Sequence, residues 1–137
     1  MPTLRFPFAL VTAERPLFQG DVTLVNVPGE RGDYGVLAGH APMATTLRAG
    51  ILDVFVQDES APPERFFVAG GFGHVTDNGF TVLAEGAVSL KDLDRTQVDR
   101  DLAAVREALA AATILPVEKA TLESRRALLE AQRQAVG

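Results

Sequence analysis

Hydrophobic and polar side chains alternate over residues 4–10, where a large apolar residue stands at every second position. This period of two predicts a half-buried β-strand. Pro7 lies within the strand, and because proline has no amide hydrogen to donate to a neighbouring strand, it predicts an edge position in the sheet. Four more short apolar stretches predict further strands: residues 22–27, 51–56, 65–69 and 80–84.

Turn-forming residues separate these stretches, at 18–20, 57–63, 70–71 and 77–79. The Asp77-Asn78-Gly79 segment is the clearest hairpin signal, since Asn-Gly favours the primed turns that join antiparallel strands. His74 precedes that turn and is expected on a strand. Several short strands at this spacing predict a sandwich or barrel of about ninety residues.

The pattern changes abruptly after Leu90. Residues 1–90 contain all eight Phe, seven of the eight Pro and eleven of the twelve Gly. Residues 91–137 contain ten Ala and sixteen charged residues, and they contain no aromatic residue. We therefore predict a β + α protein in two domains, with an all-β domain over residues 1–90 and a helical domain over residues 91–137.

The helical domain is predicted to be an antiparallel two-helix hairpin. Asp94 suits the N-cap of the first helix, and Gln97 three residues later completes a capping box. Pro116 suits the first turn of the second helix, after a short connection over residues 113–115. The first helix carries an apolar stripe at spacings of four and three, formed by Val98, Leu102, Val105, Leu109 and Ala112. The second carries small residues that would let the two helices approach closely, namely Val117, Ala120, Ser124, Ala127, Ala131 and Ala135.

The small size of this hairpin has an energetic consequence. A narrow stripe buries little apolar area, and a unit of this length rarely supplies more than about 3–5 kcal/mol of stability on its own. The hairpin must therefore gain stability from the sandwich or from another protein. A permanently docked appendage is the simpler interpretation, and an element that docks in two places and acts as a switch is the alternative.

Composition and charge exclude several classes of function. Apolar residues make up 47% of the 137 residues, which is enough for a core. There is no cysteine, so disulfides and thiolate chemistry are excluded, and two histidines are too few for a His-rich metal site. The net charge of −5 disfavours binding to nucleic acid or stable binding to anionic lipid. The chain starts without a signal peptide and has no apolar run of membrane-spanning length, so we expect a soluble, cytoplasmic protein.

No residue pattern specifies a cofactor or a catalytic site. The chain lacks the Gly-Lys-Ser/Thr of a P-loop, and the glycines of residues 69–73 predict a tight turn rather than a phosphate cradle. His40 is expected to fix its loop through backbone hydrogen bonds, with acid–base catalysis as the alternative. Glu30 and Asp33 are expected in a solvated turn, and a charged loop that contacts a partner is the second interpretation.

Glycine and proline are concentrated between Pro28 and Gly50, where five Gly and two Pro occur. The order of these residues resembles the signature of the epsilon subunit family of bacterial F-type ATP synthases. The matching segments are Pro28-Gly29, then Gly32-Asp33-Tyr34-Gly35-Val36-Leu37-Ala38-Gly39-His40-Ala41-Pro42, and then Leu47-Arg48-Ala49-Gly50. Further segments follow the family's order and spacing, at residues 10–20, Ala69-Gly70-Gly71-Phe72, Val82-Leu83-Ala84 and Leu93-Asp94.

The resemblance implies an N-terminal antiparallel β-sandwich followed by a two-helix hairpin. It implies a non-catalytic rotor subunit of the F1 central stalk, without a cofactor, that couples the gamma subunit to the c-ring for proton-driven ATP synthesis. Such a subunit lies on the cytoplasmic face of the bacterial inner membrane and contacts the membrane only through the complex. The implied c-ring contacts are Glu30, Arg31, Gly32 and Asp33. The implied gamma contacts are His40, Ala41, Pro42 and Met43.

The resemblance also implies a regulatory hairpin, which either folds against the sandwich or extends toward the alpha and beta subunits of F1 and inhibits ATP hydrolysis. Its candidate residues are Asp94, Val98, Leu102, Arg125 and Arg126. Two positions depart from the family pattern. Ala38 stands where proline is usual, which makes that turn less stiff. Gln97 stands where ATP-binding members have an arginine, so a cation that pairs with phosphate is lost and we expect weak or absent ATP binding.

Two other functions fit the sequence without the resemblance. A ligand-binding β-sandwich with a helical oligomerisation tail would need a large apolar pocket with convergent polar groups. A hydrolase that uses His40 with Asp33 would need the two side chains within hydrogen-bond reach beside a concave site.

Overall fold

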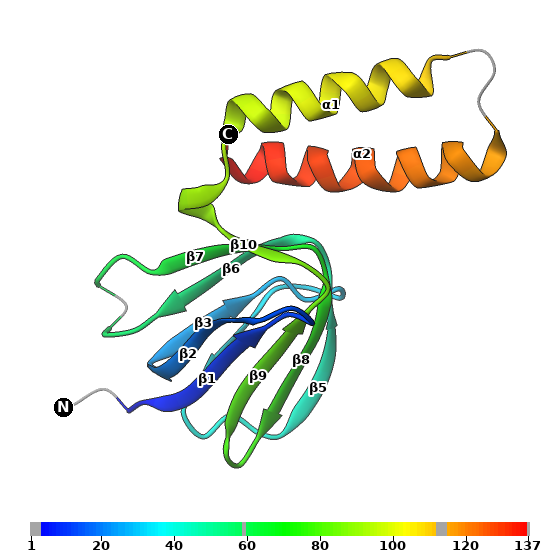
Figure 1. The fold of residues 1–137 in the computed structure, drawn as a ribbon. Helices are drawn as coiled ribbons and strands as arrows, with labels where there is room; N and C mark the ends of the chain where they lie inside the picture. Colours follow the sequence, from blue (N-terminus) through cyan, green and yellow to red (C-terminus); the bar gives the residue numbers. More distant parts are fainter. Residues whose placement is uncertain (1–3, 59, 112–114, 137) are drawn as a thin grey trace. The chain divides into compact units, whose positions relative to one another are not determined.

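The computed structural model describes residues 4–58, 60–111 and 115–136. Contacts within the chain divide it into two compact units, Met1–Ser89 and Leu90–Gly137, which we describe separately. The first unit is a sandwich of two five-stranded sheets and the second contains two long helices (Figure 1). The predicted β + α fold, with a sandwich followed by a two-helix hairpin, is confirmed.

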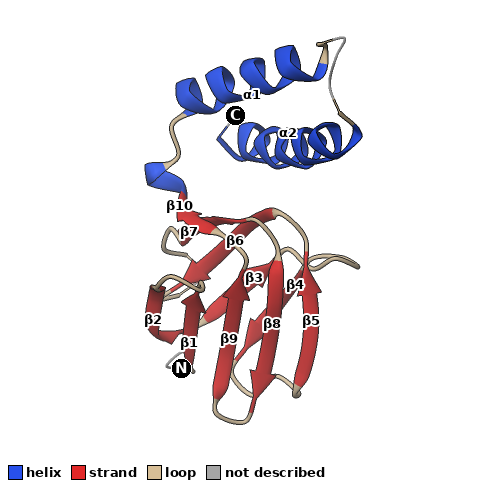
Figure 2. Cartoon of the chain, turned by 45° about the vertical axis from the view of Figure 1, so that its right-hand side comes forward, coloured by secondary structure: helices blue, strands red, loops and turns tan. Residues whose placement is uncertain are grey.

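Each sheet takes strands from several parts of the chain (Figure 2). The first sheet has the order β2-β1-β9-β8-β5 and consists of β1 (Phe6–Val11), β2 (Pro16–Val22), β5 (Met43–Leu47), β8 (Gly71–Thr76) and β9 (Gly79–Ala84). The second has the order β10-β7-β6-β3-β4 and consists of β3 (Leu24–Val27), β4 (Tyr34–Leu37), β6 (Gly50–Phe55), β7 (Glu64–Val68) and β10 (Ala87–Ser89). All pairings between these strands are antiparallel except that of β1 with β9, which is parallel.

The predicted edge position of β1 is wrong, because β1 lies between β2 and β9. Pro7 pairs with Asp21 of β2, whereas the pairing with β9 begins only at Phe8, opposite Phe80. The missing amide hydrogen of Pro7 therefore falls outside the parallel ladder, and the proline is tolerated in an inner strand. The predicted strand is confirmed for residues 6–10, but it begins at Phe6, and Leu4 lies before it and is exposed.

The predicted turn at residues 18–20 is also wrong, because β2 runs through it without interruption. Phe18 is half-buried and packs against the core, which holds this stretch in the sheet. The chain changes sheets at Thr23 instead, within the strand predicted for residues 22–27. The buried Thr23 donates two hydrogen bonds to the carbonyl oxygen of Phe55, from its amide (2.8 Å) and its hydroxyl (3.0 Å).

The predicted hairpin at residues 77–79 joins β8 to β9, and His74 lies on β8 as expected. Its turn is not of the primed type, because Asp77 and Asn78 both have negative φ and only Gly79, with φ of +139°, is positive. The hydroxyl of Thr76 accepts a hydrogen bond of 3.1 Å from the Asn78 amide and stabilises the alternative turn. The strands predicted at 51–56, 65–69 and 80–84 are confirmed as β6, β7 and β9.

The space between the two sheets is filled with apolar side chains. Phe8, Leu10, Phe80 and Leu52 are almost fully buried there, and the rings of Phe8 and Phe80 lie 5.5 Å apart. This packing leaves the functional surfaces to the ends of the sandwich and to the outward sides of its sheets.

The helical unit consists of a short 3₁₀ turn η1 (Leu90–Asp92) and the helices α1 (Arg95–Leu109) and α2 (Pro116–Val136). Asp94 caps α1 as predicted, because its carboxylate accepts a hydrogen bond of 2.9 Å from the Thr96 amide. The capping box is not formed, since the Gln97 side chain donates forward to Asp101 (2.9 Å) instead of back to the cap. Pro116 begins α2 as predicted. Three residues of the predicted stripe and connection lie outside the described residues, namely Ala112, Thr113 and Ile114.

The helices pack through leucine and valine rather than through the small residues. Val98, Leu102 and Val105 of α1 are buried as predicted, with Leu109 packed beside them. On α2 the buried partner is Leu129, with Leu122 half-buried. The predicted small-residue interface is wrong, because leucine removes more apolar area from water than alanine does. Four members of that stripe are exposed: Val117, Ala120, Ser124 and Ala127.

Candidate functional site

A glycine turn carries the first set of predicted contact residues. The amide of Gly32 donates a hydrogen bond of 3.1 Å to the carbonyl oxygen of Gly29, and Gly32 has φ of +136°, a conformation that favours glycine. Glu30, Arg31 and Asp33 are all exposed on this turn. The turn therefore presents three charged side chains to solvent on a fixed backbone.

Hydrogen bonds fasten this turn to the end of β5. The Glu30 amide donates to the carbonyl oxygen of Thr46 (2.9 Å), and the Arg48 amide donates to that of Pro28 (3.0 Å). The Arg48 guanidinium also forms an ion pair with Asp33. The strand register brings the β1–β2 turn and Glu85 to the same end of the sandwich. We call this the charged end, and it comprises Glu14, Arg15, Glu30, Arg31, Asp33, Arg48 and Glu85.

The second predicted set lies in the loop before β5. The His40 amide donates to the carbonyl oxygen of Leu37 (3.1 Å), and the His40 ring Nδ1 lies 2.8 Å from that of Ala41. Because a carbonyl oxygen can only accept, Nδ1 is the protonated nitrogen. The expected backbone hydrogen bonds of His40 are therefore present. Pro42 is exposed, and Met43 is half-buried against the core.

The structure does not bring His40 and Asp33 together. Asp33 precedes β4 and His40 follows it, and a strand of four residues spans about 13 Å. Asp33 pairs with Arg48, while the His40 ring bonds to the carbonyl of Ala41. A hydrolytic pair of these two residues, the alternative considered from the sequence, is therefore wrong.

The two predicted contact sets lie at opposite ends of β5. Met43 begins the strand beside the His40 loop, whereas Leu47 ends it beside the charged end, where Gly29 forms a bridge with Leu47. Four steps along an antiparallel strand correspond to about 14 Å. One short strand thus connects the two regions.

The outward side of the first sheet is nearly free of charge. Only two titratable residues, Asp21 and His74, point outward from it among the described strands. Phe72 (57% exposed) and Leu83 (50% exposed) are directly opposite each other on β8 and β9. The remaining outward residues are small or neutral: Pro7, Ala9, Val11, Gln19, Ala44, Thr46, Thr76 and Thr81. We call this surface the uncharged face.

Sequence reasoning missed this surface, although a signal was present. Phe72 and Leu83 stand at the positions that alternate with the core residues of their strands, such as Val75 on β8 and Val82 on β9. Exposed aromatic and aliphatic residues on a surface depleted of charge are typical of the core of a protein–protein interface.

The candidate hairpin residues have different environments. Val98 and Leu102 are buried between the helices, so they hold the hairpin together. Arg125 is exposed, and Arg126 lies 3.8 Å from Glu130 on the same helix. Two ion pairs join α1 to α2: Asp99 with Arg133 (2.7 Å) and Arg106 with Glu130 (3.4 Å).

The described residues contain neither a cluster of metal-binding side chains nor a helix that could span a membrane. Across residues 4–58, 60–111 and 115–136, no three His, Cys, Asp or Glu side chains gather closely enough to hold a metal ion. Within those same ranges, no helix has the length and apolar character needed to cross a membrane.

Comparison with known proteins decides the family. The family described as "ATP synthase, Delta/Epsilon chain, beta-sandwich domain" matches residues 5–90, which is most of the sandwich. The chain belongs to the ATP synthase delta/epsilon chain family. The resemblance seen in the glycine-rich segment and its neighbours is thereby confirmed.

Curated family members extend the match into the helical unit. The chain is similar to the "ATP synthase epsilon chain" of Parvibaculum lavamentivorans, with 54% identity over 96 residues, covering 70% of this chain and 71% of that protein. It is also similar to the "ATP synthase epsilon chain" of Hyphomonas neptunium, with 39% identity over 129 residues and 94% of each chain covered.

Solved structures share the fold of the whole chain. A chain from "Cryo-EM structure of Euglena gracilis mitochondrial ATP synthase, OSCP/F1/c-ring in rotational state 1" matches with a TM-score of 0.80 and 24% identity, covering 100% of this chain and 84% of that chain. A chain from the Tetrahymena thermophila mitochondrial ATP synthase central stalk and c-ring matches with a TM-score of 0.68 and 12% identity, covering 100% of both.

Proposed function

We propose that this delta/epsilon-family chain is a non-catalytic subunit of the ATP synthase central stalk, which couples the gamma subunit to the c-ring. The observation that carries this proposal is the family match over the sandwich, together with its similarity to named epsilon chains. Transfer of torque requires a stiff body with two separate adhesive surfaces. The filled core and the two regions at opposite ends of β5 support that role.

The gamma subunit is proposed to bind the uncharged face and the neighbouring loop of His40, Ala41, Pro42 and Met43. Phe72 and Leu83 provide the apolar centre of this surface, and burying them on docking supplies the hydrophobic part of the affinity. Because the surface carries almost no charge, docking removes few ionised groups from water.

The c-ring is proposed to bind the charged end through Glu30, Arg31, Gly32 and Asp33. The exposed residues 30–33 offer both signs of charge, so they can pair with complementary charges on a polar loop of the ring. The backbone of this turn is fixed by the hydrogen bonds to β5, so docking orders little additional chain. Contact with the cytoplasmic side of the inner membrane would then occur only through the complex.

The hairpin is proposed to interact with the alpha and beta subunits of F1 and to inhibit ATP hydrolysis. Its core is small, with Val98, Leu102, Val105 and Leu129 as its fully buried side chains among the described residues. An element with so little internal stability gains much from docking elsewhere. Gln97 donates to Asp101 and offers no cation to a phosphate, which supports weak or absent ATP binding.

A binding experiment with purified gamma subunit tests the coupling role. The full chain is expected to bind gamma, and the double variant Phe72→Ser with Leu83→Ser is expected to lose most of that affinity. The double variant Leu115→Ser with Val117→Ser is the matched control, because both residues are exposed (62% and 79%) and lie at the start of the second hairpin helix, outside the proposed gamma surface. If the full chain does not bind gamma, the proposal fails. If the control loses as much affinity as the variant with Phe72 and Leu83 replaced, the uncharged face is not the docking surface.

The inhibitory role needs a separate measurement on the assembled complex. Removal of residues 91–137 is expected to raise the ATPase activity, provided that the shortened chain still assembles with gamma. Unchanged activity in a correctly assembled complex would refute inhibition and leave only the coupling role.

A further inference from the structure

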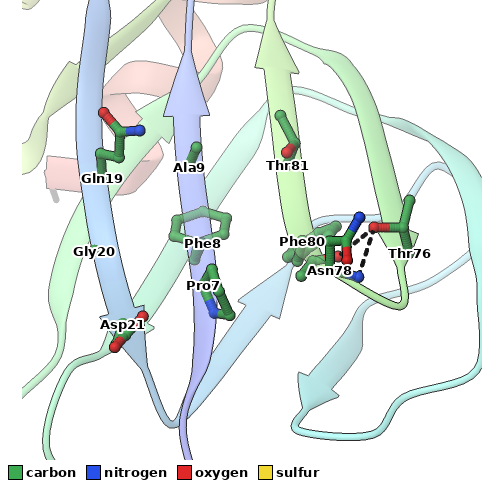
Figure 3. A pocket seen from close by; sticks show the side chains of 11 residues that line it. Pro7, Phe8, Ala9, Gln19, Gly20, Asp21, Thr76, Asn78, Phe80 and Thr81 are labelled. Atoms are coloured by element: carbon green, nitrogen blue, oxygen red, sulfur yellow. Dashed lines mark hydrogen bonds between the residues drawn. The ribbon is translucent and has the colours of Figure 1, made fainter.

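A groove opens in the uncharged face where β9 begins (Figure 3). It has a volume of about 320 Å³ and lies over β2, β1 and the β8–β9 hairpin. Its polar side chains are Gln19, Asp21, Thr76, Asn78 and Thr81, and its lining also includes Gly20 and Ala9. This volume is at the lower end of the range of small-molecule pockets, about 300 to 1,000 Å³, and it can accommodate one large side chain.

The lining residues that the structure describes offer hydrogen-bond acceptors and one negative charge, but no positive charge. Among the described residues that line the groove, Asp21 is the only charged one, and none is a lysine, arginine or histidine. The amide oxygens of Gln19 and Asn78 and the hydroxyl of Thr81 can all accept hydrogen bonds. In the described part of the chain, the side chains of Gln19, Asp21, Asn78 and Thr81 form no hydrogen bond with other protein groups. The groove therefore offers a carboxylate and several free acceptors.

We propose that this groove receives a basic side chain of the gamma subunit, paired with Asp21, when gamma docks on the uncharged face. This inference rests on the proposed function. Arginine is the better match, because its guanidinium has five donors and no acceptor, and its planar fork can bond to a carboxylate and an amide oxygen together. A single ion pair inside an otherwise neutral interface fixes the register of docking more than it adds affinity.

The groove also depends on a close approach of two backbones. A side chain at Gly79 would overlap with the carbonyl oxygen of Pro7, so glycine is required where β9 meets β1. The backbone of Asn78 is thereby held beside β1 and β2. The backbone N–H of Asn78 also donates a hydrogen bond of 3.1 Å to the hydroxyl of Thr76. The backbone around the groove is therefore fixed before any partner binds, so docking has to order only the side chains that line it.

Binding of gamma to charge variants tests the inference. Asp21→Asn is expected to weaken binding of the full chain to purified gamma by about tenfold, because the partner's cation loses its counter-charge within the interface. Asp77→Asn is the matched control, since it removes the same charge at the tip of the adjacent hairpin without lining the groove. It is expected to change the affinity less than twofold. Asp21→Glu is expected to retain most of the affinity.

The outcomes separate this inference from the function on which it rests. If the unaltered chain does not bind gamma, both are overturned. If it binds and Asp21→Asn binds equally well, only the inference is overturned. An equal loss in the Asp21 and Asp77 variants also overturns it, because net charge alone would then explain the effect. A selective loss in Asp21→Asn that shrinks as salt concentration rises supports it.

Discussion

The hydroxyl of Tyr34 on β4 shares a hydrogen bond with the hydroxyl of Thr45 on β5, and this bond joins the edge strands of the two sheets. Gly73 makes room for it, because a Cβ there would lie 3.0 Å from the Tyr34 hydroxyl oxygen. The pair closes one open side of the sandwich between the regions proposed to contact gamma and the c-ring.

Loss of this hydrogen bond is expected to destabilise the sandwich. Tyr34→Phe should lower the free energy of unfolding by about 0.5–1.5 kcal/mol, the net contribution of a typical hydrogen bond. Urea denaturation measures the change. Thr45→Val removes the other hydroxyl with little change in shape, and the double variant should lose less than the sum of the two single variants. Strict additivity would show that the two hydroxyls do not interact.

The glycine turn at the charged end is expected to tolerate no side chain at Gly29. A Cβ there would overlap with the carbonyl oxygen of Gly32 and lie 3.0 Å from the Tyr34 ring. Gly29→Ala should therefore lower the free energy of unfolding by about 1–3 kcal/mol. Gly86→Ala is the control, because its Cβ would meet only the Ala69 Cβ at 3.6 Å. Equal losses for the two variants would contradict the assigned turn geometry.

The hairpin is expected to depend on Leu129. Truncation of a buried leucine costs about 2–5 kcal/mol, a large share of what so small a unit can supply. Leu129→Ala should therefore increase amide hydrogen exchange at Val98, Leu102 and Val105. Val117→Ala lies on the exposed stripe of the same helix and should leave that exchange unchanged. If Val117→Ala had the larger effect, the small-residue stripe would be the true interface.

A titration of Asp58 tests the loop between β6 and β7. Hydrogen bonds from the Ser60 hydroxyl, the Ser60 amide and the Ala61 amide favour the ionised carboxylate and lower the pKa of Asp58 below its ordinary value of 3.8, against a smaller opposing effect of burial. A lowered pKa stabilises the folded loop above pH 3.8, and this contribution is lost as the pH falls through the folded pKa. Carboxyl NMR should show the low pKa in the unaltered chain and a rise toward 3.8 in Ser60→Ala. An unchanged pKa in that variant would exclude the hydroxyl as its main cause.

The sequence predicts those strands in which apolar and polar residues alternate strongly, such as β9. It does not predict strands that form mainly because a neighbouring strand pairs with them. β4 contains Gly35 and β5 contains Ala44, which are both depleted in strands, and neither strand shows a clear alternation. The strand state of β4 depends on pairing with β3, and that of β5 depends on pairing with β8, which lies far along the chain. The edge rule failed at Pro7 because register, which no local pattern fixes, places its missing amide outside the ladder.

In the helical unit and the candidate site too, local features are predictable from the sequence and features set by packing are not. Asp94 was identified as a cap because capping is local, whereas Gln97 had two possible partners within one turn and took Asp101. On α2, the alanines and the leucines form separate stripes, and only the packed structure decides that Leu129 faces α1. The groove beside Asp21 could not be predicted, because it joins residues from strands that are distant in sequence.

The position of β5 between its two neighbouring loops has a mechanical consequence. A pull that separates the His40 loop from the Glu30 turn acts along the covalent backbone of β5, which is already extended and can lengthen little. The register pairs from Met43 with Val75 to Leu47 with Gly71 hold the strand in that extended state. Such loading suits a part that must withstand repeated twisting without unravelling.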